Sequence, residues 1–165
     1  MVMPGEFRVF LRMNGCVESI VEHMSWAMEC ECVERTGGGG WERIVPSMGV
    51  VREIVEGDEE ARRIVEDMLF PGLKERKGEE EGGTNMEPLN AEPYTVGWKV
   101  IKCMTSVEGK LKRAASELAW AVTGGDPKKF VRGTGFGNAV HLLGIKGIVN
   151  TPKHDDGKDK GQKGQ

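Results

Sequence analysis

The chain has 165 residues, of which 38% are hydrophobic, and its formal net charge is -3. This length suits one domain with tails, and the slightly acidic balance without a large basic patch argues against nucleic-acid binding. No apolar run approaches the ~20 residues of a membrane span, and residues 1–13 lack the charged start and long apolar core of a secretory signal. We therefore expect a cytoplasmic protein with no membrane span.

The first helix is expected from about Cys16 to Arg35. Its apolar residues repeat at helical spacing and predict a buried stripe, which comprises Val17, Ile20, Val21, Met24 and Met28, with Ala27 alongside. Trp26 falls outside this stripe, and we favour packing on a second surface over the alternative of an exposed anchor for a partner. Four glycines after Thr36 end the helix, because their backbone entropy disfavours a helical conformation.

The four cysteines, Cys16, Cys30, Cys32 and Cys103, do not form a C-x-x-C pair. Cys30 and Cys32 would point to different sides of one helix, because residues two apart do not share a face. The nearest histidine, His23, belongs to the same predicted helix and does not complete a zinc-type spacing. We expect reduced thiols and no bound metal.

Two helices are predicted between Trp41 and Pro71. Pro46 lies inside the first apolar pattern, and a proline in mid-helix costs about 3 kcal/mol, so we place the helix start near Pro46 with a lead-in turn before it. Asp58 is expected to cap the second helix, and Pro71-Gly72 to stop it. The buried stripe of this second helix is the clearest in the chain and comprises Ala61, Ile64, Val65, Met68 and Leu69.

Residues 73–93 carry many charges and few apolar side chains, which predicts a disordered or loosely held loop between the two helical parts, 1–72 and 94–150. A helix follows at about Thr95–Thr105, with Trp98 and Cys103 beside its apolar side. Residues 151–165 are polar and repetitive, which predicts a disordered tail.

The segment from Ser106 to Asn150 predicts a long helix over Val107–Val122, a short helix and a last helix. The apolar stripe of the long helix comprises Val107, Leu111, Ala114, Ala115, Leu118, Ala119 and Val122. Gly124-Gly125 provides the helix stop, since glycine adopts the left-handed conformation without a steric penalty. Asp126 caps the short helix and Pro127 occupies its first position.

This segment resembles the synembryn family, the cytosolic chaperones and guanine-nucleotide exchange factors of heterotrimeric G-protein α subunits (Gα). The matching motif is T-G-F-G-N-A followed by L-L, which here begins at Thr134, and a preceding helix with Arg113, Ala114, Ala115 and Glu117. The resemblance extends to Val45–Leu73 and fades upstream of Trp41. Family members are helical solenoids several times this length, so the resemblance covers only their C-terminal end.

The resemblance implies an all-α armadillo- or HEAT-type helical repeat that acts on Gα by protein–protein contact, without covalent chemistry or a cofactor. Candidate contact residues are the basic cluster of Lys128, Lys129 and Arg132, for which a solvated helix face is the alternative, and Trp98. Trp120 is a further possible anchor that we expect to lie in the core. Two other functions stay open: a helical-repeat scaffold for another peptide, and a truncated, inactive synembryn-like product.

The glycine motif from Gly133 to Asn138 also has the appearance of a dinucleotide-binding loop. Such a loop follows a buried strand, and the residues before Gly133 are not a buried strand. We therefore assign the motif residues Thr134, Gly135, Phe136, Gly137 and Asn138 to structure. The glycines form a sharp corner, Phe136 fills the helix interface, and Asn138 hydrogen-bonds backbone groups.

The three histidines, His23, His141 and His154, have no Ser or Cys arrangement that spacing supports as a catalytic site. We expect His141 to be a partly buried packing residue at the start of the last helix.

Overall fold

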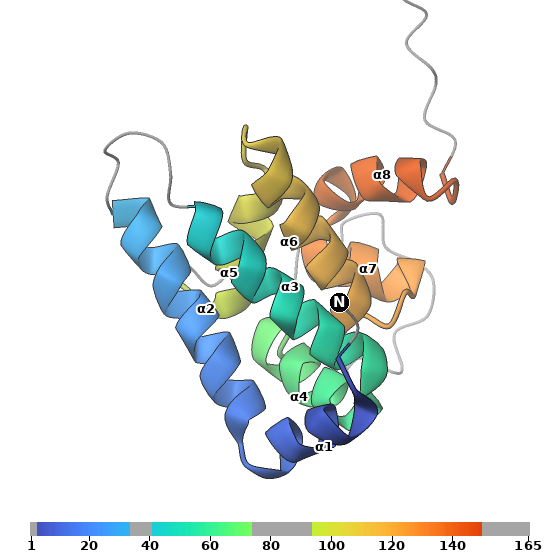
Figure 1. Cartoon of the computed structure of the whole chain (residues 1–165). Helices are drawn as coiled ribbons and strands as arrows, with labels where there is room; N and C mark the ends of the chain where they lie inside the picture. The colour runs from blue at the N-terminus through green and yellow to red at the C-terminus, as the bar shows by residue number, and fades with distance from the viewer. Residues whose placement is uncertain (1–2, 34–40, 74–93, 150–165) are drawn as a thin grey trace, which may run out of the picture.

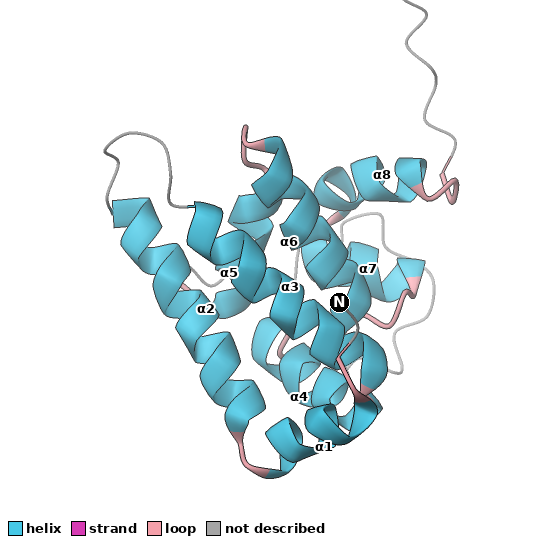
Figure 2. Ribbon diagram, in the orientation of Figure 1, coloured by secondary structure: helices cyan, strands magenta, loops and turns pink. Residues whose placement is uncertain are grey.

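The computed structural model describes residues 3–33, 41–73 and 94–149, with side chains up to residue 29 in the first range. All of the regular structure in these ranges is helical, and no strand is drawn in Figure 2. The helices are α1 (Gly5–Met13), α2 (Cys16–Val33), α3 (Trp41–Gly57), α4 (Glu59–Leu69), α5 (Val96–Met104), α6 (Gly109–Val122), α7 (Pro127–Thr134) and α8 (Phe136–Ile145). The predicted all-α class is confirmed.

Three helices, α2, α3 and α6, lie side by side in one layer, and α4 and α5 pack behind them (Figure 1). The helices α3 and α6 run in the same direction, while α2 runs opposite to them. Trp41 at the start of α3 and Lys110 at the start of α6 meet, with the ammonium 4.7 Å from the ring centroid. α7 and α8 pack against the far side of α6. The α2–α3–α6 layer therefore has α4 and α5 on one of its two sides.

The predicted caps are confirmed. The Asp58 carboxylate accepts hydrogen bonds from the backbone N–H groups of Glu60 and Ala61, both at 3.0 Å, and so satisfies two free donors at the start of α4. Asp126 does the same for α7, with Pro127 at its first turn. Gly124 and Gly125 have φ of 68° and 71° and end α6, as glycine does at helix C-termini.

Three cases differ from the expectation: one helix that was not predicted and two helix starts. Helix α1 was not expected, although Pro4 followed by Phe7 and Leu11 carries a weak helical signal. α3 begins at Trp41 and contains Pro46. Proline has no backbone N–H, so the helix loses the hydrogen bond to the carbonyl of Glu42, but Glu42 is exposed near the start of the helix and water can bind this carbonyl instead.

In the third case, α6 begins at Gly109, not at Val107. Glu108 caps the helix, with its carboxylate accepting from the backbone N–H of Lys110. Val107 therefore precedes the helix and is fully exposed.

The predicted stripes supply most of the core, which includes Val17, Met24, Met28, Val65, Leu69, Leu118 and Val122. The prediction that Trp26 packs was wrong: its side chain is 57% exposed on α2, because the neighbouring helices cover only the opposite stripe. The expected glycine break at 36–40, the loop at 74–93 and the tail at 151–165 lie outside the described residues. Leu73, the first residue of that expected loop, is buried.

Candidate protein-binding surface

An apolar groove of about 780 Å³ runs beside α3 on the face of the α2–α3–α6 layer. Its lining comes from the N-terminal segment, from α3 and from α6, and comprises Met3, Pro4, Phe7, Val45, Pro46, Met48, Gly49, Val50, Arg52, Glu53 and Ala114. Eight of these eleven residues are apolar and glycine is a ninth, so most of the wall offers no hydrogen bond. Such a lining suits the apolar side chains of a protein partner, which gain by leaving water.

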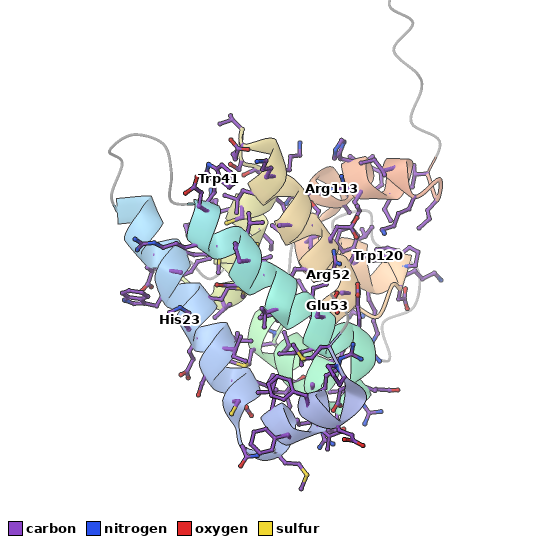
Figure 3. All side chains as sticks on the ribbon, viewed as in Figure 1. His23, Trp41, Arg52, Glu53, Arg113 and Trp120 are labelled. Carbon is purple, nitrogen blue, oxygen red and sulfur yellow. The ribbon has the colours of Figure 1, made fainter. Side chains whose placement is uncertain are left out.

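The charged residues of the groove lie towards the end of α3, where Figure 3 labels Arg52 and Glu53. Glu53 lies 4.0 Å from the Arg8 guanidinium of α1 and 3.9 Å from that of Arg52. Arg52 also lies 3.4 Å from Glu56. The groove is thus apolar along most of its wall and charged at one end. Such a charged end would orient a partner that carries a complementary charge.

A second hollow of about 290 Å³ lies on the other side of α3. Four residues of α2 and two of α3 line it: Cys16, Ser19, Ile20, His23, Ser47 and Val50. Val50 lines both hollows, so α3 forms a ridge between them. Trp26 continues the line of Ile20 and His23 along α2, and its ring lies 5.8 Å from that of His23 (Figure 3 labels His23). The exposed tryptophan is therefore placed beside a hollowed surface, which is where interface anchors are found.

Helix α1 is attached to the corner between α3 and α4. Arg12 Nε lies 3.0 Å from Asp58 Oδ2, and the Arg8 guanidinium lies directly over Gly57. Burial by itself raises the pKa of Asp58, but the backbone N–H of Ala61, the Arg12 guanidinium and the N–H of Glu60 outweigh it, and the pKa is lowered overall. Asp58 therefore has two roles, as the cap of α4 and as the acceptor for α1.

The predicted basic cluster is divided by the structure. Lys128 is exposed at the start of α7, whereas Lys129 turns inward and lies 3.3 Å from Glu66, a carboxylate on α4 with 3% of its side chain exposed. Arg132 is half-buried and takes part in an interaction of its own. Lys129 therefore stabilises the fold, and the three side chains do not form one exposed basic patch.

Trp98 lies on α5, half-buried, with its ring 5.8 Å from the ring of Tyr94 and 5.2 Å from the ammonium of Lys102. The helix α5 packs on α2, α4 and α6, while α7 packs on α6 and α8. Trp98 and the basic residues therefore lie on two helices, α5 and α7, that are not among the packed helix pairs of the described residues. Trp120 is half-buried and packs against the core, as expected, with its ring nearly perpendicular to that of Phe130.

The glycine motif forms the corner between α7 and α8. Gly135 caps the end of α7 and the start of α8 with φ of 82°, and the Asn138 side-chain amide donates to the Thr134 carbonyl at 2.7 Å. Thr134 is buried and its hydroxyl donates to the Phe130 carbonyl at 2.8 Å. These parts of the prediction are confirmed.

The prediction that Phe136 fills the helix interface was wrong, because Phe136 is 60% exposed and Phe130 is the buried ring at this corner. Gly137 has open space around its Cα. Gly133 belongs to helix α7 and packs against the ring of Phe70, and the part of the chain before it is helical. A dinucleotide-binding loop, which needs a preceding strand, does not fit this geometry.

Sequence reasoning missed two buried charges and misjudged one histidine. Lys99 on α5 is 6% exposed and its ammonium donates to Glu29 at 2.7 Å and to Ser25 at 2.8 Å on α2. Glu66 on α4 is 2% exposed, and its position outside the predicted apolar stripe gave no sign of this burial. His141 was expected to be partly buried and is exposed.

Among the described side chains, no three His, Cys, Asp or Glu residues gather as metal ligands would. Within the same ranges, every helix is too short or too polar to cross a bilayer. The fold and surface thus define an all-α protein with an open apolar groove on one helical layer.

A family model described as guanine nucleotide exchange factor synembryn matches residues 10–165. The chain belongs to this family. It is also similar to proteins named Chaperone Ric-8A, with 24% identity to that of Danio rerio and 25% to that of Xenopus laevis, in each case over 108 residues. The matched segment is 66% of this chain and 18% of each relative, so the chain matches under a fifth of the length of these relatives.

Proposed function

We propose that this chain takes part in chaperoning Gα and in releasing its bound guanine nucleotide, through protein–protein contact in the cytoplasm. The observation that carries the proposal is the synembryn family match over residues 10–165, supported by relatives that are named as chaperones. The chain needs no covalent chemistry for this role, so it is a binding protein and not an enzyme.

The mechanism follows from differential binding. A protein that binds nucleotide-free Gα more tightly than GDP-bound Gα shifts the equilibrium towards the nucleotide-free form, and by no more than the difference in binding free energy. The apolar groove beside α3 and the exposed Trp26 are the surfaces on this chain that suit such contact. The parallel α3 and α6, with α4 and α5 behind them, are consistent with an armadillo- or HEAT-type repeat.

The test is a pull-down of purified GDP-bound Gα by the 165-residue chain, followed by measurement of GDP release. We expect retention of Gα and faster release of GDP. Retention without faster release would reduce the role to docking, and no retention would favour a scaffold for another peptide or an inactive product.

The contact residues are tested by charge reversal and truncation. Trp26→Ala should weaken Gα retention with little effect on stability, since the side chain is 57% exposed. Lys128→Glu tests the exposed member of the predicted basic cluster, and Trp98→Ala tests the predicted anchor on α5. Arg63→Ala is the control, because Arg63 pairs with Glu59 and Glu60 on its own helix, α4.

A further inference from the structure

Helix α8 lies at the edge of the molecule, where it packs on α7 and α6 (Figure 1). Its buried side comprises Ala139, Leu142 and Leu143, which belong to the core. Of the eight helices in the described ranges, α8 is the one whose sequence, FGNAVHLLGI, contains no Asp, Glu, Lys or Arg. A helix without a charged side is normally covered on all sides, because apolar surface gains by leaving water.

The other side of α8 is open to solvent. We call it the α8 face, and its residues, all exposed or half-buried, are Phe136, Gly137, Val140, His141, Gly144 and Ile145. The two largest apolar side chains, Phe136 and Ile145, are 60% and 68% exposed. Ile148, just after the helix, is also exposed. A contiguous uncharged and mostly apolar face of this kind indicates an interaction surface.

The α8 face is symmetric about its midpoint, which lies between Val140 and His141. Gly137 and Gly144 are seven residues, about two turns, apart and lie along the middle of the face. Val140 and His141 lie on either side of this line. A Cβ added at Gly137 would meet no described atom within 4 Å, so the backbone of a second helix can approach closely here.

The absence of charge restricts the kind of partner. Two different proteins usually align complementary charges across their interface, and a helix that lies on a membrane places basic residues beside its apolar side chains. The α8 face offers no charge for either purpose, and Lys146 at its end already pairs with Glu117 of α6 at 3.3 Å. A second copy of the chain needs no such charges, because a two-fold contact brings the same uncharged surface to both sides.

We propose that the α8 faces of two copies of this chain pack antiparallel in a weak dimer with two-fold symmetry. In this arrangement Gly137 lies level with the second copy's Gly144, while Val140 and His141 lie beside the axis and each meets its own counterpart. The two Lys146 residues lie at opposite ends of the pair, roughly 16 Å apart along the helices, at 1.5 Å per residue. Salt screens charges over about 8–10 Å, so this repulsion is small. The dimer does not depend on the proposed function.

The first measurement is the mass of the full chain in solution. One helix pair buries less than the ~1,200–2,000 Å² of a stable interface, so we expect a Kd of about 10–100 μM. Sedimentation velocity at pH 8, where an ordinary histidine is neutral, should show a rise from the mass of one chain to that of two between about 5 and 500 μM. A single-chain mass throughout this range would overturn the proposal.

The second measurement uses His141, which is exposed in the single chain and meets its own counterpart in the dimer. His141→Lys and His141→Asp each place two like charges beside the axis and should weaken the dimer at least about tenfold. An equimolar mixture of the two variants should restore it, because lysine then meets aspartate. His23→Lys is the matched control, since His23 is an exposed histidine on α2, and it should dimerise like the parent chain.

Thermal melts check that every variant is folded before its mass is measured. Dimers of unchanged strength in both His141 variants would overturn the pairing through α8. The same conclusion would follow from a mixture that stays monomeric, or from an equal loss of dimer in His23→Lys.

Discussion

Glu66 on α4 and Lys129 on α7 form an ion pair across 63 residues of sequence, with Oε1 and Nζ 3.3 Å apart. The carboxylate is almost completely buried, whereas 43% of the lysine side chain is exposed. The lysine therefore reaches inward from the surface to neutralise a charge that water cannot solvate. This pair fixes α7, which carries the glycine corner, to α4.

Lys129→Ala should destabilise the chain by about 1–3 kcal/mol, a range discounted for the partial exposure of the lysine, because a buried carboxylate loses a charged partner. Lys128→Ala removes the same charge one residue earlier, from an exposed position, and should change stability by less than about 0.5 kcal/mol. Urea denaturation followed by circular dichroism measures both. Equal effects of the two substitutions would show that the inward pair does not stabilise the fold.

Asp58 predicts an acid-sensitive contribution to stability. Its pKa is lowered in the folded state, so the stabilisation is fully present above the pKa of the unfolded chain and is lost as the pH falls through the folded-state value. Asp58→Ala should cost about 1–2 kcal/mol near neutral pH through loss of the cap. It should also reduce the pH dependence of stability on the acid side.

Asp58→Asn separates the two roles of this residue, because asparagine caps a helix nearly as well as aspartate but cannot form the ion pair with Arg12. We expect it to retain most of the stability at neutral pH and to lose the acid-side dependence. Urea denaturation at a series of pH values tests this. An unchanged acid limb in Asp58→Asn would contradict the assignment.

The glycine corner offers a test with two glycines two residues apart. Gly135 has φ of 82° and ψ of 146°, a region that is nearly exclusive to glycine, so Gly135→Ala should cost about 1–3 kcal/mol. Gly137 lies in α8 with open space around it, and Gly137→Ala should be neutral or stabilise by up to about 1 kcal/mol. In thermal melts, the unfolding temperature should fall for Gly135→Ala and should stay the same or rise for Gly137→Ala.

Two phenylalanines near the same corner should respond very differently to truncation. Phe130 is fully buried, with its ring 5.4 Å from that of Trp120, and Phe130→Ala should cost about 3–5 kcal/mol. Phe136 is 60% exposed, so Phe136→Ala should cost less than about 1 kcal/mol. A large loss of stability for Phe136→Ala would show that its ring is buried in solution.

The sequence predicted most of the helices well, because the determinants are local. Asp58 and Asp126 cap the helices that follow them, and Gly124-Gly125 ends α6, as their types and positions indicate. The two wrong predictions, a start of α3 near Pro46 and a start of α6 at Val107, concern helix ends. The sequence pattern near a helix end is often compatible with more than one first residue. Helix α1 was not predicted, because it has nine residues and none of them is buried, so it has no buried stripe of the kind that identifies the other helices.

The candidate surface was much less predictable. The groove combines the N-terminal segment, α3 and Ala114 of α6, and nothing in the local pattern of any of these indicates the other two. The predicted contact residues follow from charge and motif, and the structure turns Lys129 inward and places Trp98 on α5, which does not form a packed pair with α7. Sequence periodicity identifies the buried stripe of a helix but does not say how far the neighbouring helices cover its sides.

The amino-acid sequence by itself determined the all-α class, the buried stripes and the caps, because each depends on side chains within about one or two helical turns. Only the tertiary structure decided that Glu66 and Lys99 are buried, since their partners Lys129 and Glu29 lie 63 and 70 residues away. The same holds for the exposure of Trp26 and Phe136, which depends on where other helices end. Local chemistry sets the helices, and the packing of distant segments sets which of their charges are neutralised and which apolar side chains are left for a partner.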